Sequence, residues 1–143
     1  MELYTLVYLS KSTIPLYRYQ IHRLLAECRL FNLKNNVTGI LLSLDGHFIQ
    51  VLEGDEEIIL SLYDKIKKDS RHTDIRIILE KPIKKRVFLD WSMGYKDISE
   101  LELRNIPYLN LFLENKIVSD SVDIASDVYG LLVQFRDDPE CFS

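Results

Sequence analysis

The sequence predicts an α+β domain of the ferredoxin-like class, in which two helices cover one face of a sheet, followed by further helices. Segments with strand and helix patterns succeed one another in the order β-α-β-β-α-β-β, and the first six match the split βαβ motif. Asp45-Gly46, a strong signal for a two-residue hairpin turn, separates two apolar segments. The chain has 143 residues, 47% of them hydrophobic and 28% charged, as expected for one domain with a packed core and a short appendage.

Side-chain patterns predict the first five segments in order. Residues 3–9 (LYTLVYL) are apolar on both alternating faces, which is typical of a strand covered on both sides. Residues 16–32 are predicted as a helix because apolar side chains recur at three- and four-residue spacing: Ile21, Leu24, Leu25, Cys28 and Phe31. Residues 34–36 break the helix, and the strands 37–44 and 47–53 form the two arms of the hairpin.

The next segments complete the predicted sheet. Asp55 is a good N-cap for a helix that reaches about Asp69 and carries apolar side chains at four-residue spacing: Ile58, Leu62 and Ile66. Residues 74–80 (DIRIILE) alternate as a strand, and residues 87–93 (VFLDWSM) are predicted as the fifth strand.

The composition changes after about Asp97, so we divide the chain into a domain of residues 1–97 and a C-terminal helical extension of residues 98–143. Within the extension we expect helices near residues 107–116 and 121–136, because Pro107 suits a first helical turn and the second segment carries an apolar stripe.

Charge and cysteine content exclude several classes of protein. The net charge of −4 disfavours a general electrostatic nucleic-acid binder. The two cysteines form no CxxC pair, zinc spacing or disulfide framework, so a reduced, cytoplasmic setting is the simplest interpretation. The N-terminus shows no signal-peptide pattern, and no apolar run approaches the roughly 20 residues of a membrane helix. We therefore expect a cytoplasmic protein with no direct contact to nucleic acid or membrane.

Three polar side chains occupy positions where the pattern predicts apolar ones. Gln50 shares a strand face with Phe48 and Leu52, Tyr8 lies on a predicted central strand, and Asn32 continues the apolar stripe of the first helix. All three could be structural: Gln50 bonded to local backbone or at a sheet margin, Tyr8 packed in the core with one hydroxyl partner, and Asn32 closing its helix. Alternatively, they point into one cavity, where the Tyr8 hydroxyl meets the Gln50 amide and the amide recognises a polar ligand.

Two further groups allow both structural and functional interpretations. Trp91 and Met93 share a face of the predicted fifth strand and are either core packing or side chains that a movable strand brings to a ligand. The run from Asp69 through Arg71 to His72 is either a solvated turn or a source of hydrogen bonds and one positive charge beside a cofactor. The sequence shows no metal-ligand spacing, no glycine-rich phosphate loop and no hydrolase motif.

These residues resemble the BLUF domain, the blue-light sensor domain that uses FAD. The resemblance covers about residues 2–95, and the combination of F-x-Q-x-L-E-G with a downstream R-x-F-x-x-W-S-M is specific. It rests on LVYLS with Tyr8, CRLFN ending at Asn32, VTGILL, FIQVLEG with Gln50, DSRH beginning at Asp69, and RVFLDWSM ending at Met93. Phe31 departs from part of the family, because some members carry a second polar side chain at that position.

The resemblance implies a ferredoxin-like sheet and non-covalent FAD between the two helices, with the ring edge hydrogen-bonded by Gln50 and Asn32. Tyr8 would donate an electron to the excited flavin. Gln50, bonded to both Tyr8 and the flavin, would then change its orientation or tautomer, and the flavin spectrum would shift to the red. Trp91 and Met93 would lie on the strand that relays the change.

The resemblance also implies the surroundings of the flavin and the output. Ile66 and the apolar stripe of the first helix would sandwich the ring, and Asp69, Arg71 and His72 would lie near the cofactor. Residues 98–143 are too few for a cyclase, a phosphodiesterase or a DNA-binding domain, so the chain resembles short stand-alone members that signal to a protein partner. We expect a photoreceptor rather than an enzyme, and a homo-oligomer, because the open sheet face needs covering.

Two other functions remain open at this stage. The chain could be a cofactor-free, ferredoxin-like protein-binding module in which Gln50 and Tyr8 are only structural; a colourless protein that refuses added FAD would support that reading. It could also be a flavin-dependent oxidoreductase, although the sequence has no nicotinamide fingerprint. Failure of NADH or NADPH to bleach the flavin would dismiss this second alternative.

Overall fold

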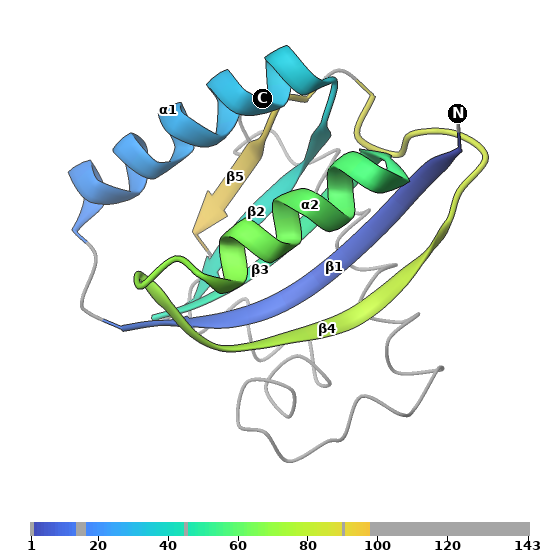
Figure 1. Cartoon of the computed structure of the whole chain (residues 1–143). Helices are drawn as coiled ribbons and strands as arrows, with labels where there is room; N and C mark the ends of the chain where they lie inside the picture. The colour runs from blue at the N-terminus through green and yellow to red at the C-terminus, as the bar shows by residue number, and fades with distance from the viewer. Residues whose placement is uncertain (1, 14–16, 45, 90, 98–143) are drawn as a thin grey trace, which may run out of the picture.

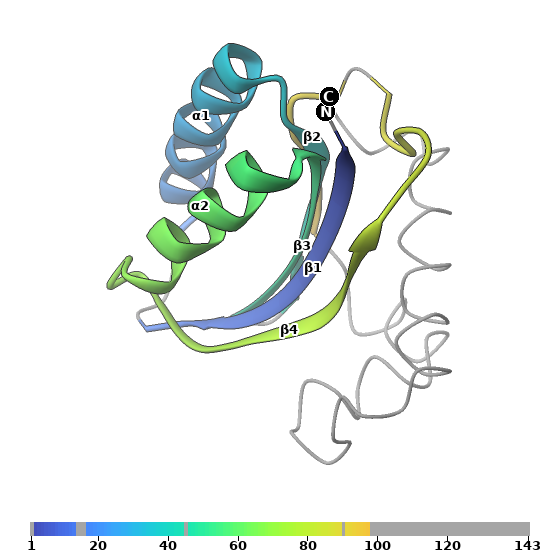
Figure 2. The ribbon, with the colours of Figure 1, turned by 45° about the vertical axis from the view of Figure 1, so that its right-hand side comes forward.

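The computed structural model describes residues 2–13, 17–44, 46–89 and 91–97. Its five strands form one sheet, and both helices lie on the same side of that sheet (Figures 1 and 2). The predicted α+β, ferredoxin-like fold is confirmed, whereas the predicted C-terminal helices lie outside the described residues. The elements in chain order are β1 (Leu3–Ser12), α1 (Arg18–Asn35), β2 (Thr38–Leu44), β3 (His47–Asp55), α2 (Glu56–Lys67), β4 (His72–Pro82) and β5 (Gly94–Asp97).

The strand order across the sheet is β4-β1-β3-β2-β5. The first four strands pair antiparallel, as predicted, and β5 pairs parallel to β2 with Ile40 opposite Gly94. Strand β1 therefore has neighbours on both sides, and its residues from Tyr4 to Leu9 are buried. This confirms the prediction from its two apolar faces.

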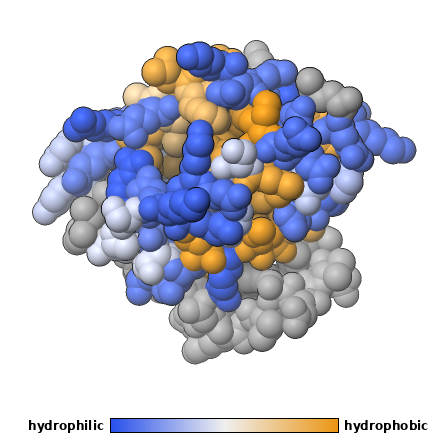
Figure 3. All heavy atoms as spheres, in the orientation of Figure 1, coloured by the Kyte–Doolittle hydropathy of each residue, from blue (hydrophilic) through white to orange (hydrophobic). Residues whose placement is uncertain are grey.

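The core that positions the site lies between the sheet and the two helices. Because side chains alternate along a strand, every second residue of β1 and β3 faces the helices. The buried apolar residues of this layer are Tyr4, Leu6, Tyr8, Leu25, Val37, Leu41, Phe48, Leu52, Ile59, Tyr63 and Met93. Seen from the helices, the outer surface is largely hydrophilic, and the hydrophobic surface is divided into separate areas (Figure 3).

Local signals set the ends of the helices. Helix α1 extends three residues beyond the predicted end and stops where Asn36 adopts the left-handed conformation, with φ 57°. The Asp55 side chain accepts a hydrogen bond from the Glu57 backbone N–H at 3.0 Å, so the predicted N-cap of α2 is confirmed. Of the helices in the described ranges, none combines the length and apolar character needed to cross a membrane.

The prediction of a strand at residues 87–93 is wrong, because β5 begins only at Gly94. The backbone N–H groups of Val87 and Phe88 donate to the Glu53 carboxylate, at 2.7 and 3.0 Å, rather than to a neighbouring strand. Leu89 has a φ of 50°, which is incompatible with an extended strand. We call residues 86–89 and 91–93 the bridging segment.

Candidate functional site

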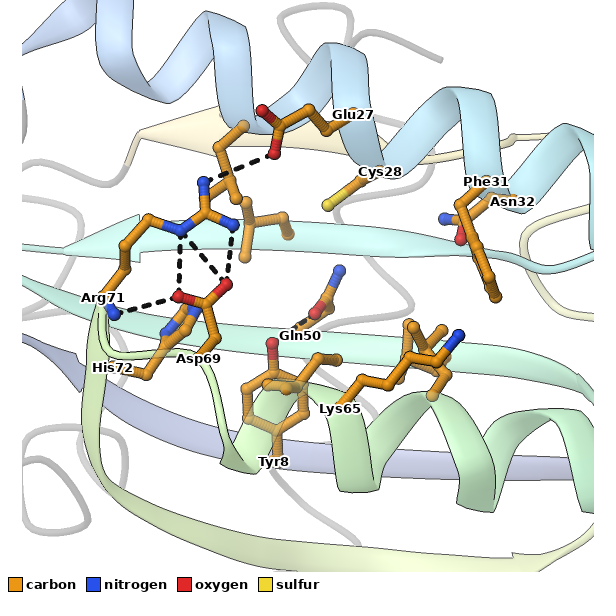
Figure 4. Close-up of a pocket in the computed structure, with 15 residues that line it drawn as sticks. Tyr8, Glu27, Cys28, Phe31, Asn32, Gln50, Lys65, Asp69, Arg71 and His72 are labelled. Carbon is orange, nitrogen blue, oxygen red and sulfur yellow. Dashed lines mark hydrogen bonds and ion pairs between the residues drawn. The ribbon is translucent and has the colours of Figure 1, made fainter.

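A cavity of about 320 Å³ lies between α1, α2 and the sheet (Figure 4). Its size and its largely apolar lining, with a few polar groups, are typical of a small-molecule site. The lining residues are Tyr8, Leu24, Glu27, Cys28, Phe31, Asn32, Leu41, Gln50, Leu52, Leu62, Lys65, Ile66, Asp69, Arg71 and His72.

Tyr8 and Gln50 form the polar centre of the sheet side of this cavity. They are direct partners in the antiparallel pairing of β1 with β3 and point toward one another (Figure 4). The Tyr8 hydroxyl donates a hydrogen bond to Gln50 Oε1, and Gln50 Nε2 donates to Met93 Sδ at 3.4 Å. Three side chains that are far apart in the sequence thus form one hydrogen-bonded row.

Burial keeps the Tyr8 hydroxyl of this row protonated. Tyr8 is 2% exposed and Gln50 is 4% exposed. Burial, helped by the nearby Cys28, Tyr63 and Asp69, raises the pKa of Tyr8 well above its usual range, so its hydroxyl keeps its proton. The hydroxyl can therefore donate to Gln50, which turns the amide oxygen toward Tyr8 and the amide nitrogen toward Met93.

Asn32 serves both the helix end and the cavity. Its backbone carbonyl accepts hydrogen bonds from the N–H groups of Asn36 and Val37, which close α1. Its buried side chain lines the cavity and donates from Nδ2 to the Ser92 carbonyl at 2.6 Å. The structural and functional interpretations of Asn32 are therefore compatible, because they concern different atoms.

A charged group lines one end of the cavity. Arg71 Nη2 contacts Asp69 at 2.6 Å, and Arg71 Nη1 reaches Glu27 of α1 at 3.4 Å (Figure 4). The hydrogen bonds from Arg71 lower the pKa of Asp69 to about 2. Burial lowers the pKa of His72, whose Nδ1 lies 3.0 Å from Ser10 Oγ. This end thus offers a cation paired with carboxylates and a neutral imidazole.

The helices supply the apolar walls. Ile66 and Leu62 come from α2, and Phe31 and Cys28 from α1. Lys65 Nζ lies 5.1 Å from the centre of the Phe31 ring, so this aromatic side chain attracts a cation to the cavity wall. Burial raises the pKa of Cys28 to about 11, so its thiol stays protonated.

The structure separates Trp91 from Met93. Met93 is fully buried beside Gln50, and Arg29 Nε donates to its backbone carbonyl at 3.0 Å. Trp91 does not line the cavity. Its ring packs against Phe88, and the two ring centres lie 6.3 Å apart. The prediction that they share a strand face is wrong, since this segment is irregular. Met93 contacts Gln50, which lines the cavity, whereas Trp91 packs against Phe88.

The sequence reasoning missed the polar residues that hold the bridging segment. Glu53 is fully buried on a central strand, and Arg86 bonds to the backbone carbonyls of Glu53 and Asn36. Glu53 shares its strand face with Ile49 and Val51, so the criterion that singled out Gln50 would have found it too. Within the described ranges, no three His, Cys, Asp or Glu side chains are grouped to hold a metal ion.

Fold and cavity together define a small-molecule-binding α+β domain, and the comparisons identify its family. The family model "BLUF: Sensors of blue-light using FAD" matches residues 3–94. This chain belongs to the BLUF family, whose cofactor is FAD.

The curated relatives are photoactivated enzymes. The chain is 34% identical over 90 residues to photoactivated adenylate cyclase subunit beta of Euglena gracilis. The aligned residues cover 62% of this chain and 10% of that protein. It is 37% identical over 87 residues to subunit alpha from the same organism, covering 61% and 8%. The chain thus spans about a tenth of the length of these relatives.

Solved structures match over more of the chain. The dark-state structure of the BLUF protein BlrB has a TM-score of 0.73 and 28% identity, covering 93% of this chain and 96% of that one. The photo-activated state of BlsA has a TM-score of 0.74 and 25% identity, covering 94% and 95%. A bacterial light-regulated adenylyl cyclase matches with a TM-score of 0.70 and 33% identity, covering 79% and 36%.

The cavity suits the flavin of this cofactor. A flat aromatic ring system needs apolar walls on both of its faces, which α1 and α2 provide with Phe31 and Ile66. The polar edge of a flavin needs donors and acceptors, and Gln50 and Asn32 present amides to the cavity. Arg71 adds a cation at the charged end.

Proposed function

We propose that this chain is a blue-light photoreceptor unit in which Tyr8 is the electron donor and Gln50 is the switching amide. The observation that carries the proposal is the hydrogen-bonded row Tyr8–Gln50–Met93, whose first two members line the cavity between the helices. Bound FAD would absorb the light and supply the electron acceptor. Gln50 and Asn32 would orient the ring edge, Ile66 would cover one face of the ring, and Asp69, Arg71 and His72 would line the charged end of the cavity.

The geometry of Tyr8 supports a coupled loss of an electron and a proton. A phenol that loses an electron becomes strongly acidic, so its proton needs an acceptor in place. Gln50 Oε1 already accepts the hydrogen bond from the Tyr8 hydroxyl. If Gln50 Oε1 took this proton and Nε2 gave one to the bound flavin, which would have accepted the electron, Gln50 would be left as its neutral tautomer. Return of the electron and one proton to Tyr8 would then allow the amide to settle in a new orientation.

The changed amide would act on the bridging segment through Met93. We propose that the domain is residues 1–97, that the segment passes the change to the C-terminal region 98–143, and that the output is contact with a signalling protein. The named relatives include light-regulated adenylyl cyclases, which supports control of an effector as the output. Self-association into a homo-oligomer belongs to the same proposal.

The experiment compares light-minus-dark absorbance spectra of the FAD-loaded wild type, Tyr8→Phe and Gln50→Leu. We expect a reversible red shift of the flavin band in the wild type and its loss in both variants, while FAD stays bound. The matched control is Tyr63→Phe, since Tyr63 is also buried and its ring lies 5.8 Å from that of Tyr8. A normal red shift in Tyr8→Phe would remove Tyr8 from the donor role.

Two further measurements test the output and the reaction class. A pull-down in light and in darkness should capture a partner in only one of the two states, and equal capture would contradict light-dependent signalling. Addition of NADH or NADPH should leave the flavin oxidised, because the proposed function involves no hydride transfer. Rapid bleaching by either nucleotide would favour an oxidoreductase.

A further inference from the structure

The bridging segment is attached to both faces of β3. Gln50 points to the cavity, and Glu53, three residues further along the strand, points to the opposite face, because successive side chains alternate. Gln50 contacts Met93 at the end of the segment, whereas Glu53 contacts its beginning. The two ends of one short segment are thus held by one strand from two sides.

Glu53 holds the beginning through a dense set of hydrogen bonds. Its carboxylate is fully buried and accepts from Val87 N at 2.7 Å, from Phe88 N at 3.0 Å and from Thr38 Oγ1 at 3.0 Å. The two oxygens of a carboxyl group can accept several hydrogen bonds at once, so this one side chain holds two consecutive backbone N–H groups. Arg86 Nη1 donates to the same threonine hydroxyl at 2.9 Å and completes the cluster.

The end of the segment is held by two amides that line the cavity and by Arg29 of α1, whose Nε donates to the Met93 carbonyl at 3.0 Å. Gln50 Nε2 donates to Met93 Sδ, and Asn32 Nδ2 donates to the Ser92 carbonyl. Both amides face the flavin site, so a change there acts directly on these two contacts. Glu53 does not line the cavity.

Trp91 lies between the two held ends and ties the segment to its own beginning and to the sheet. Its backbone N–H donates to the Phe88 carbonyl at 2.9 Å, and its carbonyl accepts from the Gly39 N–H of β2 at 3.0 Å. Neither Trp91 nor Gly39 lines the cavity. The part of the segment that depends on the cavity amides is therefore Ser92 and Met93.

We propose that Glu53 is a positioning residue that keeps residues 86–88 stationary, so that a change at Gln50 and Asn32 moves residues 92–93 relative to them. This inference rests on the proposed photoreceptor function. It assigns the signal a fixed end and a moving end within the same segment. The partner would then read the position of the moving end relative to the sheet.

The test is amide hydrogen exchange by NMR on the FAD-loaded chain in darkness and under blue light. In the wild type we expect light to change exchange at Ser92 and Met93 about tenfold and to leave Val87 and Phe88 within about twofold. In Glu53→Gln, exchange at Val87 and Phe88 should rise about tenfold in darkness and become light-dependent. The absorbance red shift should stay normal in this variant, because Tyr8 and Gln50 are intact.

Glu57→Gln, on the exposed surface of α2, is the matched control and should behave as the wild type. If Glu53→Gln does not fold, Thr38→Val decides the question: removal of the hydroxyl that joins Glu53 to Arg86 should raise exchange at Val87 and Phe88 in the same way.

Three exchange results would contradict a stationary beginning of the segment. The first is unchanged protection of Val87 and Phe88 in the folded Glu53 variant. The others are wild-type light changes at Val87 and Phe88 as large as those at Ser92 and Met93, or no light change at any of these four residues. The failure of the photoreceptor proposal looks different. In that case the wild type shows no absorbance shift, and the proposed movement of residues 92–93 is refuted together with the photoreceptor function. If the wild type shows the absorbance red shift, the exchange data test the role of Glu53 alone.

Discussion

The Tyr8–Gln50 hydrogen bond can be tested without light, by a double-mutant cycle on the free energy of unfolding. The cycle compares the wild type with Tyr8→Phe, Gln50→Leu and the double variant. Tyr8→Phe leaves Gln50 Oε1 without the donor that it has in the native structure, and Gln50→Leu leaves the Tyr8 hydroxyl without its acceptor. Both side chains are at most 4% exposed, so bulk water does not replace the missing partner.

The burial of the pair sets the expected magnitude. A buried polar group that loses its partner costs about 1–3 kcal/mol, so each single variant should be destabilised by that amount. The double variant has neither polar group, and replacing both partners by apolar groups of similar shape is close to neutral. We therefore expect a coupling free energy of about 1–3 kcal/mol, with the double variant less destabilised than the sum of the singles.

Urea unfolding in darkness, followed by far-ultraviolet circular dichroism, measures the four free energies. All proteins need the same saturating concentration of free FAD, because bound ligand adds to the apparent stability. Tyr63→Phe paired with Gln50→Leu is the control, since among the described residues Gln50 bonds to Tyr8 and Met93 and not to Tyr63. Additivity of the Tyr8 and Gln50 effects within about 0.5 kcal/mol would refute the reasoning.

Three further changes test the surroundings of the site. The Asp69 pKa is lowered from 3.8 to about 2, so its stabilisation is present above pH 4 and is lost as the pH falls toward 2. Because Arg71 is 40% exposed, the wild type should lose only about 1 kcal/mol more than Asp69→Asn over this range; equal unfolding free energies at every pH would contradict this. Met93→Leu should cost less than about 1.5 kcal/mol in unfolding free energy but change the rate of dark recovery, since leucine cannot accept from Gln50; an unchanged rate would remove Met93 from the relay. Trp91→Ala should lower the unfolding free energy by about 1–3 kcal/mol and alter dark recovery. Its FAD affinity, measured by fluorescence titration, should stay within about twofold because Trp91 does not line the cavity, and a tenfold loss would contradict that placement.

Local signals were enough to predict most of the fold. The two apolar faces of β1, the hairpin turn at Gly46 and the Asp55 cap each depend on residues that are neighbours in the sequence. The prediction failed at residues 87–93, where the backbone donors bond to Glu53, more than thirty residues earlier. A pattern confined to the segment itself cannot contain that partner.

The candidate site was partly predictable for an energetic reason. A polar side chain on an apolar face must find a partner when it is buried, so Tyr8 and Gln50 could be singled out before their partners were known. Their contact follows from the register of β1 with β3, which places them directly opposite each other. Which of Trp91 and Met93 contacts Gln50 depended on the path of an irregular segment, for which the sequence offers no periodicity.

The position of Gln50 restricts how a signal can leave the cavity. Strand β3 is paired on both sides, with β1 and β2, so the Gln50 backbone is held and the side chain is the part that can change. A thioether sulfur only accepts hydrogen bonds, so an amide that turns its oxygen toward Met93 loses that contact. The same rotation brings the Gln50 amide nitrogen to the Tyr8 hydroxyl, which must then accept a hydrogen bond from that nitrogen while its own proton turns to a different acceptor. In the proposed mechanism, rotation of one side chain therefore has to release Met93, and the bridging segment responds without movement of the central strands.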